Sequence, residues 1–366
     1  MIEKWTDLSE FLAHNYVHSA TPTRLPCGGS TDHRLTGLLC RSWQPVTANI
    51  AINLRAHVSL RPYKTGRIFV DIHGVGKQEF TAPHLPLTGP FALVSALICY
   101  FGIHGFYIDI RTEFPFQSGL GGSGAVATAL IGAIYTALNQ EAPRTRHFPS
   151  LVQIAHNLED SLFRNTGMQD QAAALYGGAN LWEWHYADRL NFKRQELVSD
   201  LSQLNEHILL AYTGRPHLES QNGSHMLDKF RETGALRLLV SISEQARRFA
   251  ESLKCQDFKS AGRALSAEYH LRSTLLPVVL EDDLELIEMA TNAQCGVSVT
   301  GHGGGGCVWA IGEMHDIADL RQQWNSAFER RKVGFLLPVN VTATGLKVSI
   351  ERSSEAHVTA RTFEYE

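Results

Sequence analysis

The stretch 115–135 constrains the fold most, because it joins a strand, a glycine-rich loop and a helix in that order. Before it, Phe106, Ile108 and Ile110 alternate with polar residues, which is the two-residue period of a strand with one buried face. After it, apolar residues recur from Ala125 onward at helical spacing. The sequence therefore predicts a loop that leads directly into a helix.

The loop itself suits a polyphosphate. Its glycines let the backbone approach a ligand closely, and the first helical turn offers unpaired N–H groups and the positive end of the helix dipole. The segment Gly119–Gly124 contains no lysine and departs from both the G-x-x-x-x-G-K-[ST] and the G-x-G-x-x-G patterns. An ordinary tight turn is the alternative. We interpret the segment as a phosphate-binding loop of another architecture.

Length and charge limit the classes of protein that fit. A chain of 366 residues can form two domains, and we expect residues 1–195 to form an N-terminal lobe that contains the phosphate-binding loop and residues 196–366 a C-terminal lobe. The polar stretch Asn191–Asp200 marks the expected boundary. A net charge of -4 favours small ligands over nucleic acid or a membrane surface.

Targeting signals and cysteines add little chemistry. No apolar run reaches the roughly 18 residues that span a bilayer, and the N-terminus lacks the features of a signal peptide, so we expect a cytoplasmic protein. The six cysteines form no C-x-x-C pair, which argues against zinc and a disulfide framework and for mostly buried thiols.

The expected helices cover residues 89–101, 151–162, 239–253, 284–290 and 317–328, and the expected strands residues 50–60, 67–72, 106–112, 181–185, 208–212, 335–341 and 346–350.

Three more segments combine glycine with polar residues. The segment Thr21–His33 carries Arg24 and Asp32 beside a small glycine turn, although a surface loop is the simpler interpretation. The segment Asn165–Ala173 is predicted to be a glycine turn with an acid at its tip. The segment Val297–Ile311 places glycines between two β-rich stretches, as in a hairpin loop.

Taken together, the clusters resemble the motifs of the GHMP small-molecule kinases, the group of galacto-, homoserine, mevalonate and phosphomevalonate kinases. The resemblance runs from Pro22 to about Ile350, and Gly167–Ala173 with the pair Gly177-Gly178 resembles the branch of heptose-7-phosphate kinases and fucokinases. The matching residues are Pro22, Arg24, Gly28, Gly29, Thr31 and Asp32, then Pro115, Gly119, Leu120, Gly121 and Ser123, and then Thr300, Gly301 and Gly303–Cys307.

This resemblance implies an α+β fold of two lobes, with the active site in the cleft between them and with ATP and Mg²⁺ as cofactors. It implies Asp170 as the catalytic aspartate and Arg24 as the cation near the γ-phosphate. Glu159 and Ser123 would bind the metal. The implied nucleotide-binding residues are Pro115, Gly119, Leu120, Gly121, Gly122, Ser123 and Gly124, and the implied substrate-binding residues are Thr31, Asp32, Gln169, Gly303 and Gly304.

Each chemical role has a plainer alternative from the residues alone. Arg24 could be a surface ion-pair partner, and Asp170 could brace the turn that contains it. Glu159 could belong to a solvated polar helix face, because Asn157 and Asp160 are polar too. Ser123 could be a helix N-cap. The order of the motifs favours the chemical roles.

We therefore expect an ATP-dependent sugar kinase that phosphorylates a hydroxyl of a sugar or sugar phosphate, at the anomeric position. The alternatives are a GHMP kinase for another small alcohol (galactose, an isoprenoid or an amino-acid alcohol) and a non-catalytic sensor with the kinase fold. A homodimer is left open. The motifs depart from the family pattern at Gly122, Ser30 and His302, and His217 stands where the branch often has arginine, which leaves the particular sugar open.

Overall fold

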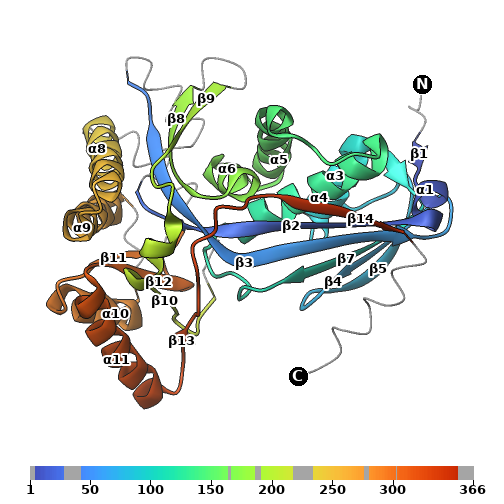
Figure 1. The fold of residues 1–366 in the computed structure, drawn as a ribbon. Helices are drawn as coiled ribbons and strands as arrows, with labels where there is room; N and C mark the ends of the chain where they lie inside the picture. Colours follow the sequence, from blue (N-terminus) through green and yellow to red (C-terminus); the bar gives the residue numbers. More distant parts are fainter. Residues whose placement is uncertain are drawn as a thin grey trace.

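The computed structural model describes residues 5–28, 43–163, 166–185, 191–216, 234–275, 280–301 and 303–352. Its larger sheet has eight strands, in the order β14-β2-β3-β7-β4-β5, with β8 and β9 continuing from β3 (Figure 1). Neighbouring strands are antiparallel except β4 and β7, which are parallel. The strands are β2 (Asn15–Pro26), β3 (Val46–Pro62), β4 (Arg67–Ile72), β5 (Gly76–Thr81), β7 (Phe106–Thr112), β8 (Ala179–His185), β9 (Asn191–Glu196) and β14 (Lys347–Arg352).

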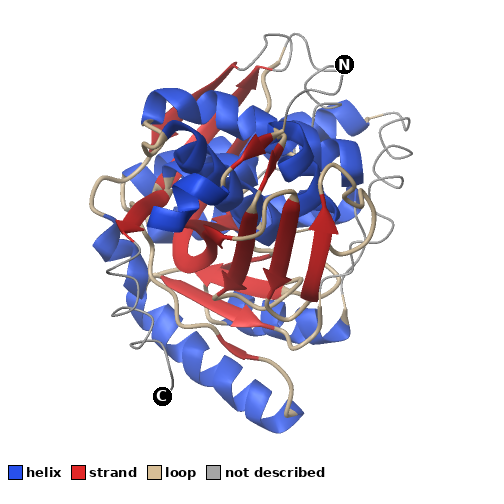
Figure 2. Ribbon diagram, turned by 90° about the vertical axis from the view of Figure 1, so that its right-hand side faces the viewer, coloured by secondary structure: helices blue, strands red, loops and turns tan. Residues whose placement is uncertain are grey.

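Helices cover one face of this sheet (Figures 1 and 2). They are α3 (Ala92–Phe101), α4 (Gly122–Asn139), α5 (Phe148–Phe163) and α6 (Gln169–Tyr176). Ile108 and Ile110 of β7 point into the same buried core as Leu130 and Ile134 of α4, as the predicted strand and helix periods require. The predicted end of α3 at Gly102 is confirmed, since this glycine adopts the left-handed conformation with φ 59°.

Helix α4 is long and apolar enough to pass a length-and-composition test for a membrane span. In this fold 67% of its residues are buried, between the sheet and the neighbouring helices. Its apolar composition is therefore explained by its place in the core. Short elements complete this part of the molecule: β1 (Thr6–Asp7), paired with β6 (Ile103–His104), α1 (Ser9–His14) and the 3₁₀ turn η1 (Thr145–His147).

A second, four-stranded antiparallel sheet has the order β11-β12-β10-β13. Alternate residues of its strands face two helical layers: Trp309 of β12 lies in one core with α8 and α9, and Val308 lies in another with α10 and α11. The elements are the 3₁₀ turn η2 (Leu201–Glu206), β10 (Ile208–Tyr212), α8 (Ala235–Lys254), α9 (Phe258–Leu275), α10 (Glu281–Asn292), β11 (Gly296–Val299), β12 (Cys307–Ile311), α11 (Met314–Arg331) and β13 (Phe335–Leu336).

The strand expected at residues 346–350 is present as β14, whereas the strand expected at 335–341 is confined to Phe335–Leu336 and two further segments differ from the expectation. The stretch expected to be a polar boundary contains β9, which pairs with β8 and whose side chains from Lys193 to Glu196 are exposed. The segment Thr21–Pro26, for which a surface loop was the simpler interpretation, is instead the buried end of β2, with a register irregularity between Pro22 and Thr23. Strand β14 returns from the C-terminal half to pair with β2. The division into lobes at residue 195 stays a prediction.

Candidate active site

The predicted phosphate-binding loop, called the phosphate loop below, lies between β7 and α4. Gly121 is the N-cap residue of α4 and has φ 78°, and Gly119 has φ 72°, so both need the left-handed conformation that glycine adopts without strain. No side chain caps the helix start among the described residues. The first N–H groups of α4 are thus available to an anionic ligand. Ser123 is exposed within the first turn and is not the N-cap, so that alternative is wrong.

Arg24 and Asp170, which are 146 residues apart in sequence, meet at this loop. Arg24 donates from Nε to Asp170 Oδ1 at 2.8 Å and lies 2.7 Å from the same oxygen through Nη2. Its Nη1 donates to the carbonyl oxygen of Gly119 at 2.9 Å. The Arg24 side chain is only 6% exposed, so its interpretation as a surface ion-pair partner is wrong, whereas the Asp170 side chain is 24% exposed. The arrangement leaves the carboxylate accessible and fixes its orientation.

The segment that carries Asp170 differs from the predicted turn. Asp170 lies in the first turn of helix α6, which begins at Gln169, rather than at the tip of a glycine turn. The helix forms here because the residues after Asp170, Gln-Ala-Ala-Ala-Leu, are good helix formers. A carboxylate in the first turn is also stabilised by the helix dipole. The helix therefore holds Asp170 more rigidly than a turn would.

Two glycines let the loop approach Asp170 closely. A Cβ atom added to Gly121 would lie 3.0 Å from Asp170 Cγ, and one added to Gly124 would lie 2.7 Å from Asp170 Cβ. Any other residue at these positions would push the start of α4 away from α6. A phosphate held by the loop would consequently lie beside the Asp170 carboxylate.

The third glycine motif contacts the phosphate loop from the other side. Thr300, which is fully buried, donates from Oγ1 to the carbonyl oxygen of Ser118 at 2.7 Å and accepts from Cys307 N at 3.1 Å. The predicted hairpin loop is confirmed, because β11 and β12 pair on either side of it. Gly303 and Gly304 are buried in this loop with φ 79° and 77°. Their contact with a substrate stays a prediction.

Glu159 is a buried carboxylate that is hydrogen-bonded to the residue next to Asp170. It lies on α5, is 5% exposed, and accepts a hydrogen bond from the side-chain amide of Gln171, the residue after Asp170. The interpretation as a solvated helix face is therefore wrong. Gln169 is also buried, and its carbonyl oxygen accepts from Asn49 Nδ2 at 3.3 Å. The metal role of Glu159 and Ser123 and the substrate role of Gln169 stay predictions.

Several predicted residues lie outside the described part of the chain: Thr31 and Asp32 of the substrate set, and the motif departures Ser30, His217 and His302.

Among the described cysteines, Cys27, Cys295 and Cys307 are buried, Cys99 is half-buried and Cys255 is exposed. Burial raises the pKa of the Cys27 and Cys307 thiols, which lie closest to the motifs in sequence. These two thiols remain protonated at neutral pH and are poor nucleophiles.

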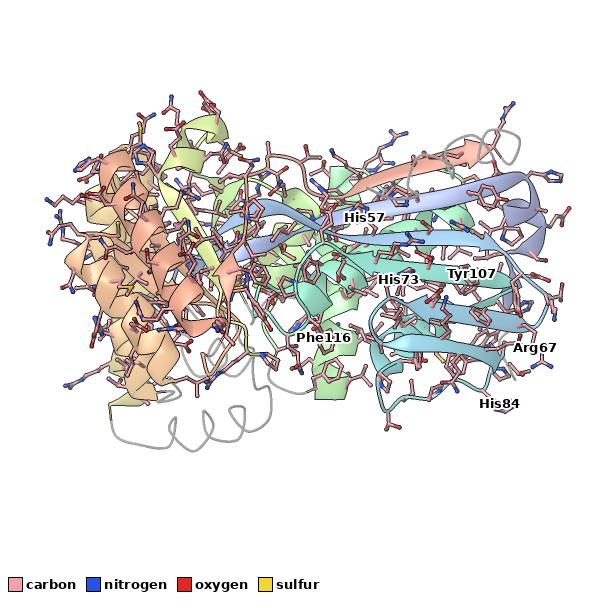
Figure 3. The ribbon with its side chains drawn as sticks, turned by 90° about the horizontal axis from the view of Figure 1, so that it is seen from below. His57, Arg67, His73, His84, Tyr107 and Phe116 are labelled. Atoms are coloured by element: carbon pink, nitrogen blue, oxygen red, sulfur yellow. The ribbon has the colours of Figure 1, made fainter. Side chains whose placement is uncertain are left out.

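A charged cluster that was not predicted from the sequence lies on the sheet face opposite the helices (Figure 3). Asp71, His73 and Asp109 have ligand atoms within 4.8 Å of one another. Yet Asp71 Oδ2 already binds Lys77 Nζ at 2.7 Å and the Tyr107 hydroxyl at 2.8 Å, and Asp109 binds Arg111 Nε at 2.9 Å. Burial and the bond to Asp71 raise the pKa of Tyr107 to about 12. The two carboxylates of the cluster are buried and already paired with cationic side chains.

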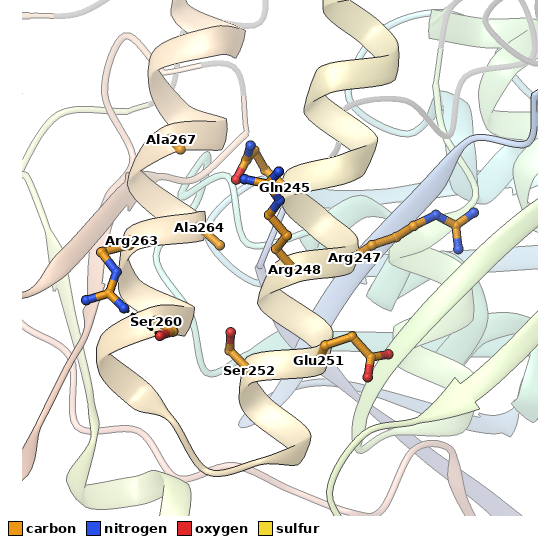
Figure 4. Close-up of a pocket in the computed structure, with 9 residues that line it drawn as sticks. All are labelled: Gln245, Arg247, Arg248, Glu251, Ser252, Ser260, Arg263, Ala264 and Ala267. Carbon is orange, nitrogen blue, oxygen red and sulfur yellow. Dashed lines mark hydrogen bonds between the residues drawn. The ribbon is translucent and has the colours of Figure 1, made fainter.

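A groove of about 620 Å³ runs along α8 and α9 and carries Arg247, Arg248 and Arg263 (Figure 4). The three guanidinium groups point in different directions. Arg247 lies 3.3 Å from Glu183, and Arg263 donates to Ser260 Oγ at 2.6 Å. None of the lining residues belongs to the three motifs, so the groove is separate from the predicted nucleotide site.

Known proteins share both the sequence and the fold. Residues 90–178 match the GHMP kinases N-terminal domain. A D-glycero-alpha-D-manno-heptose 7-phosphate kinase from Campylobacter jejuni is 24% identical over 345 residues, 90% of this chain and 98% of that protein. A mevalonate kinase from Archaeoglobus fulgidus is 27% identical over 276 residues, 71% of this chain and 83% of that protein.

Among solved structures, a D-glycero-D-manno-heptose 1-phosphate kinase from Bacteroides thetaiotaomicron has a TM-score of 0.71 to this chain at 20% identity. The match covers 91% of this chain and 98% of that one. The predicted α+β class is confirmed by this agreement. Residues 90–178 thus resemble the GHMP kinases N-terminal domain in sequence, and the chain shares the fold of GHMP kinase structures over nearly its whole length.

Proposed function

We propose that the chain is an ATP-dependent sugar kinase, which transfers the γ-phosphoryl group to a hydroxyl of a sugar or sugar phosphate. The observation that carries this proposal is the contact of the Arg24–Asp170 pair with the phosphate loop. Arg24 binds Asp170 and the carbonyl oxygen of Gly119 at once, while Gly121 and Gly124 bring the loop backbone against Asp170. Phosphoryl transfer depends mainly on such positioning and on charge.

We assign a separate role to each group of residues in the site. The loop glycines and the start of α4 bind the phosphates, and Asp170 orients the acceptor hydroxyl and takes its proton. Arg24 fixes the orientation of Asp170, because two of its nitrogens bind one carboxylate oxygen. The positive charge of Arg24 beside the loop would also stabilise negative charge on the γ-phosphoryl group during transfer.

A magnesium ion fits the donor chemistry of this region. Glu159 supplies a buried carboxylate and Ser123 an exposed hydroxyl at the start of α4, and oxygen donors of this kind suit Mg²⁺. When bound, the ion would neutralise charge on the phosphates of ATP. Because ATP is the phosphate donor, we place the protein in the cytoplasm.

A sugar acceptor has support from the relative in Campylobacter jejuni, whose name gives a heptose 7-phosphate as its substrate. We extend this to an anomeric hydroxyl, with Asp32 accepting hydrogen bonds from ring hydroxyls. A non-catalytic sensor is disfavoured, because Arg24, Glu159 and Asp170 are all present and Asp170 remains accessible. The similarity to a mevalonate kinase keeps a non-sugar alcohol as the second candidate.

A substrate panel tests this function. Purified protein is incubated with ATP, Mg²⁺ and either free sugars, sugar phosphates or mevalonate, and ADP release is measured. We expect release with a sugar or sugar phosphate, and none when the anomeric hydroxyl of that substrate is blocked as a methyl glycoside. Release with mevalonate alone would favour the second candidate. An equally active methyl glycoside would contradict the anomeric assignment but not the kinase assignment.

A further inference from the structure

Arg272 is a buried arginine that the sequence analysis did not identify. It lies in the last turn of α9, and its side chain is 7% exposed. Its Nε donates to Oε1 of Glu268, one turn earlier, at 3.0 Å, and the Glu268 side chain is 2% exposed. Burying a charged pair is costly unless further hydrogen bonds satisfy its polar atoms. The other N–H groups of the Arg272 guanidinium therefore need hydrogen-bond partners.

Those donors all reach the start of the third glycine motif. Nη1 donates to the carbonyl oxygen of Gly301 at 2.8 Å. Nη2 donates to Ser298 Oγ at 2.9 Å and lies 3.4 Å from the carbonyl oxygen of Val299. The guanidinium therefore holds residues on both sides of Thr300. A planar group with fixed donor directions can do this, whereas the single ammonium of lysine cannot.

Thr300 transmits this constraint to the phosphate loop. Its hydroxyl binds the carbonyl oxygen of Ser118 at 2.7 Å, and a Cβ on Gly119 would lie 2.7 Å from that hydroxyl. Gly119 is also held by Arg24 on its carbonyl oxygen. The loop is thus held from two sides, by Arg24 from the larger sheet and by Thr300 from the smaller one.

The glycines that follow Thr300 explain why an added clamp is useful. Gly301 has φ 60°, and the segment after it is rich in glycine, which is intrinsically permissive. We propose that Arg272, oriented by Glu268, is a positioning residue that fixes the phosphate loop for ATP through Thr300. This proposal rests on the proposed function, in that the loop must bind ATP.

Calorimetry with ATP and Mg²⁺ tests the proposal without any need for the sugar. We expect Arg272→Met to weaken ATP binding at least tenfold, and Arg272→Lys to retain part of the affinity because it keeps the charge but loses the fork. Ser298→Ala, which removes one acceptor and little volume, should fold even where Arg272→Met does not. It should weaken ATP binding by about threefold, as expected for loss of one modest hydrogen bond.

A second ion pair in the same half of the chain provides the matched control. Arg331 of α11 donates from Nε to Oε2 of Glu285 on α10 at 2.8 Å, and its side chain is 13% exposed. Arg331→Met removes one of the two arginines that bind Glu285, the other being Arg330, and none of the described contacts joins Arg331 to the glycine motifs. We expect it to lower the melting temperature but leave ATP affinity within about twofold, since distant sites act independently.

A double-mutant cycle separates positioning from general stability. If Arg272 acts through Thr300, the losses of ATP affinity in Arg272→Lys and Thr300→Val should combine less than additively, because the second change removes a link that the first has already loosened. Additive losses, or unchanged ATP affinity in Arg272→Lys and Ser298→Ala, would overturn the inference while the kinase assignment stands. Wild-type protein that binds no ATP would overturn both.

Discussion

At the scale of single residues, Asp170 is the side chain on which the proposed chemistry depends. Its Oδ1 is committed to Arg24, yet the side chain is one-quarter exposed, at 24%. The charge-assisted bonds from the guanidinium fix the orientation of the carboxylate, which stays accessible to an acceptor hydroxyl. The neighbouring glycines leave it beside any phosphate on the loop.

We predict that Asp170→Asn lowers kcat by about a hundredfold or more, which is the range expected for a positioned general base. The amide oxygen can still accept from Arg24, so the fold and nucleotide binding should persist. A coupled assay for ADP gives kcat, and calorimetry gives the ATP affinity of the same preparation. Activity within about threefold of the wild type would remove Asp170 from the catalytic role.

The sequence suggests candidate site residues, but not the contacts between them. Arg24 is expected near the γ-phosphate and Asp170 at the acceptor hydroxyl, and the structure joins the two side chains directly. The bond from Thr300 to Ser118 spans 182 residues, and no local pattern indicates it. The burial of Glu159 was hidden because polar neighbours, Asn157 and Asp160, surround it in sequence.

At the scale of elements, periodicity predicted most helices and strands, whereas the whole of β2 was missed. Two prolines, Pro22 and Pro26, and the nearby glycines indicate a loop. The sheet accommodates Pro22 where the register between β2 and β3 shifts. Helix α6 was predicted as a turn because Gly167 dominates the local pattern. In both segments the tertiary setting overrides the local signal.

The junction between the loop and α4 gives a prediction with a close control. Gly121 and Gly74 have nearly the same left-handed backbone, with φ 78° and 80°, but a Cβ on Gly74 meets nothing within 4 Å whereas one on Gly121 meets Asp170. Alanine at either position should cost roughly 1–2 kcal/mol in the free energy of unfolding, from the backbone conformation alone.

Only Gly121→Ala should impair catalysis. A displaced carboxylate can lower the rate by about 10²-fold, so we expect a loss of ten- to a hundredfold in kcat/KM for Gly121→Ala and less than about twofold for Gly74→Ala. Denaturant titration and steady-state kinetics on both variants provide the comparison. Equal kinetic losses in the two variants would show that strain, and not the contact with Asp170, is responsible.

At the scale of the whole molecule, the two sheets share a core. Leu25 of β2 and Ile50 of β3 belong to the same buried cluster as Phe249 of α8 and Trp309 of β12. Trp309 also donates from Nε1 to the carbonyl oxygen of Pro26 at 3.1 Å. Sequence patterns could not reveal this continuity, because they report which residues are buried but not which element they are buried against.

The shared core predicts that the protein unfolds as one unit. Proteins of this length often unfold in separate steps, but here neither half can lose its structure without exposing apolar surface of the other. Scanning calorimetry should show a single transition. Its calorimetric enthalpy should be about 250 kcal/mol, because globular proteins absorb roughly 0.7 kcal/mol per residue on unfolding near 60 °C. The van't Hoff enthalpy should agree with it. Two resolved transitions in the wild type would contradict the prediction.

Leu25→Ala then tests where the coupling lies. Leu25 is fully buried in the shared core, and Leu12, equally buried, lies in the core between the larger sheet and its own helices. Each substitution should cost about 2–5 kcal/mol in the free energy of unfolding, from lost burial and the cavity that remains. Only Leu25→Ala removes contacts that join the two sheets, so it should broaden or split the transition, whereas Leu12→Ala should lower its midpoint and keep it single. Identical thermograms for the two variants would place the coupling outside the shared core.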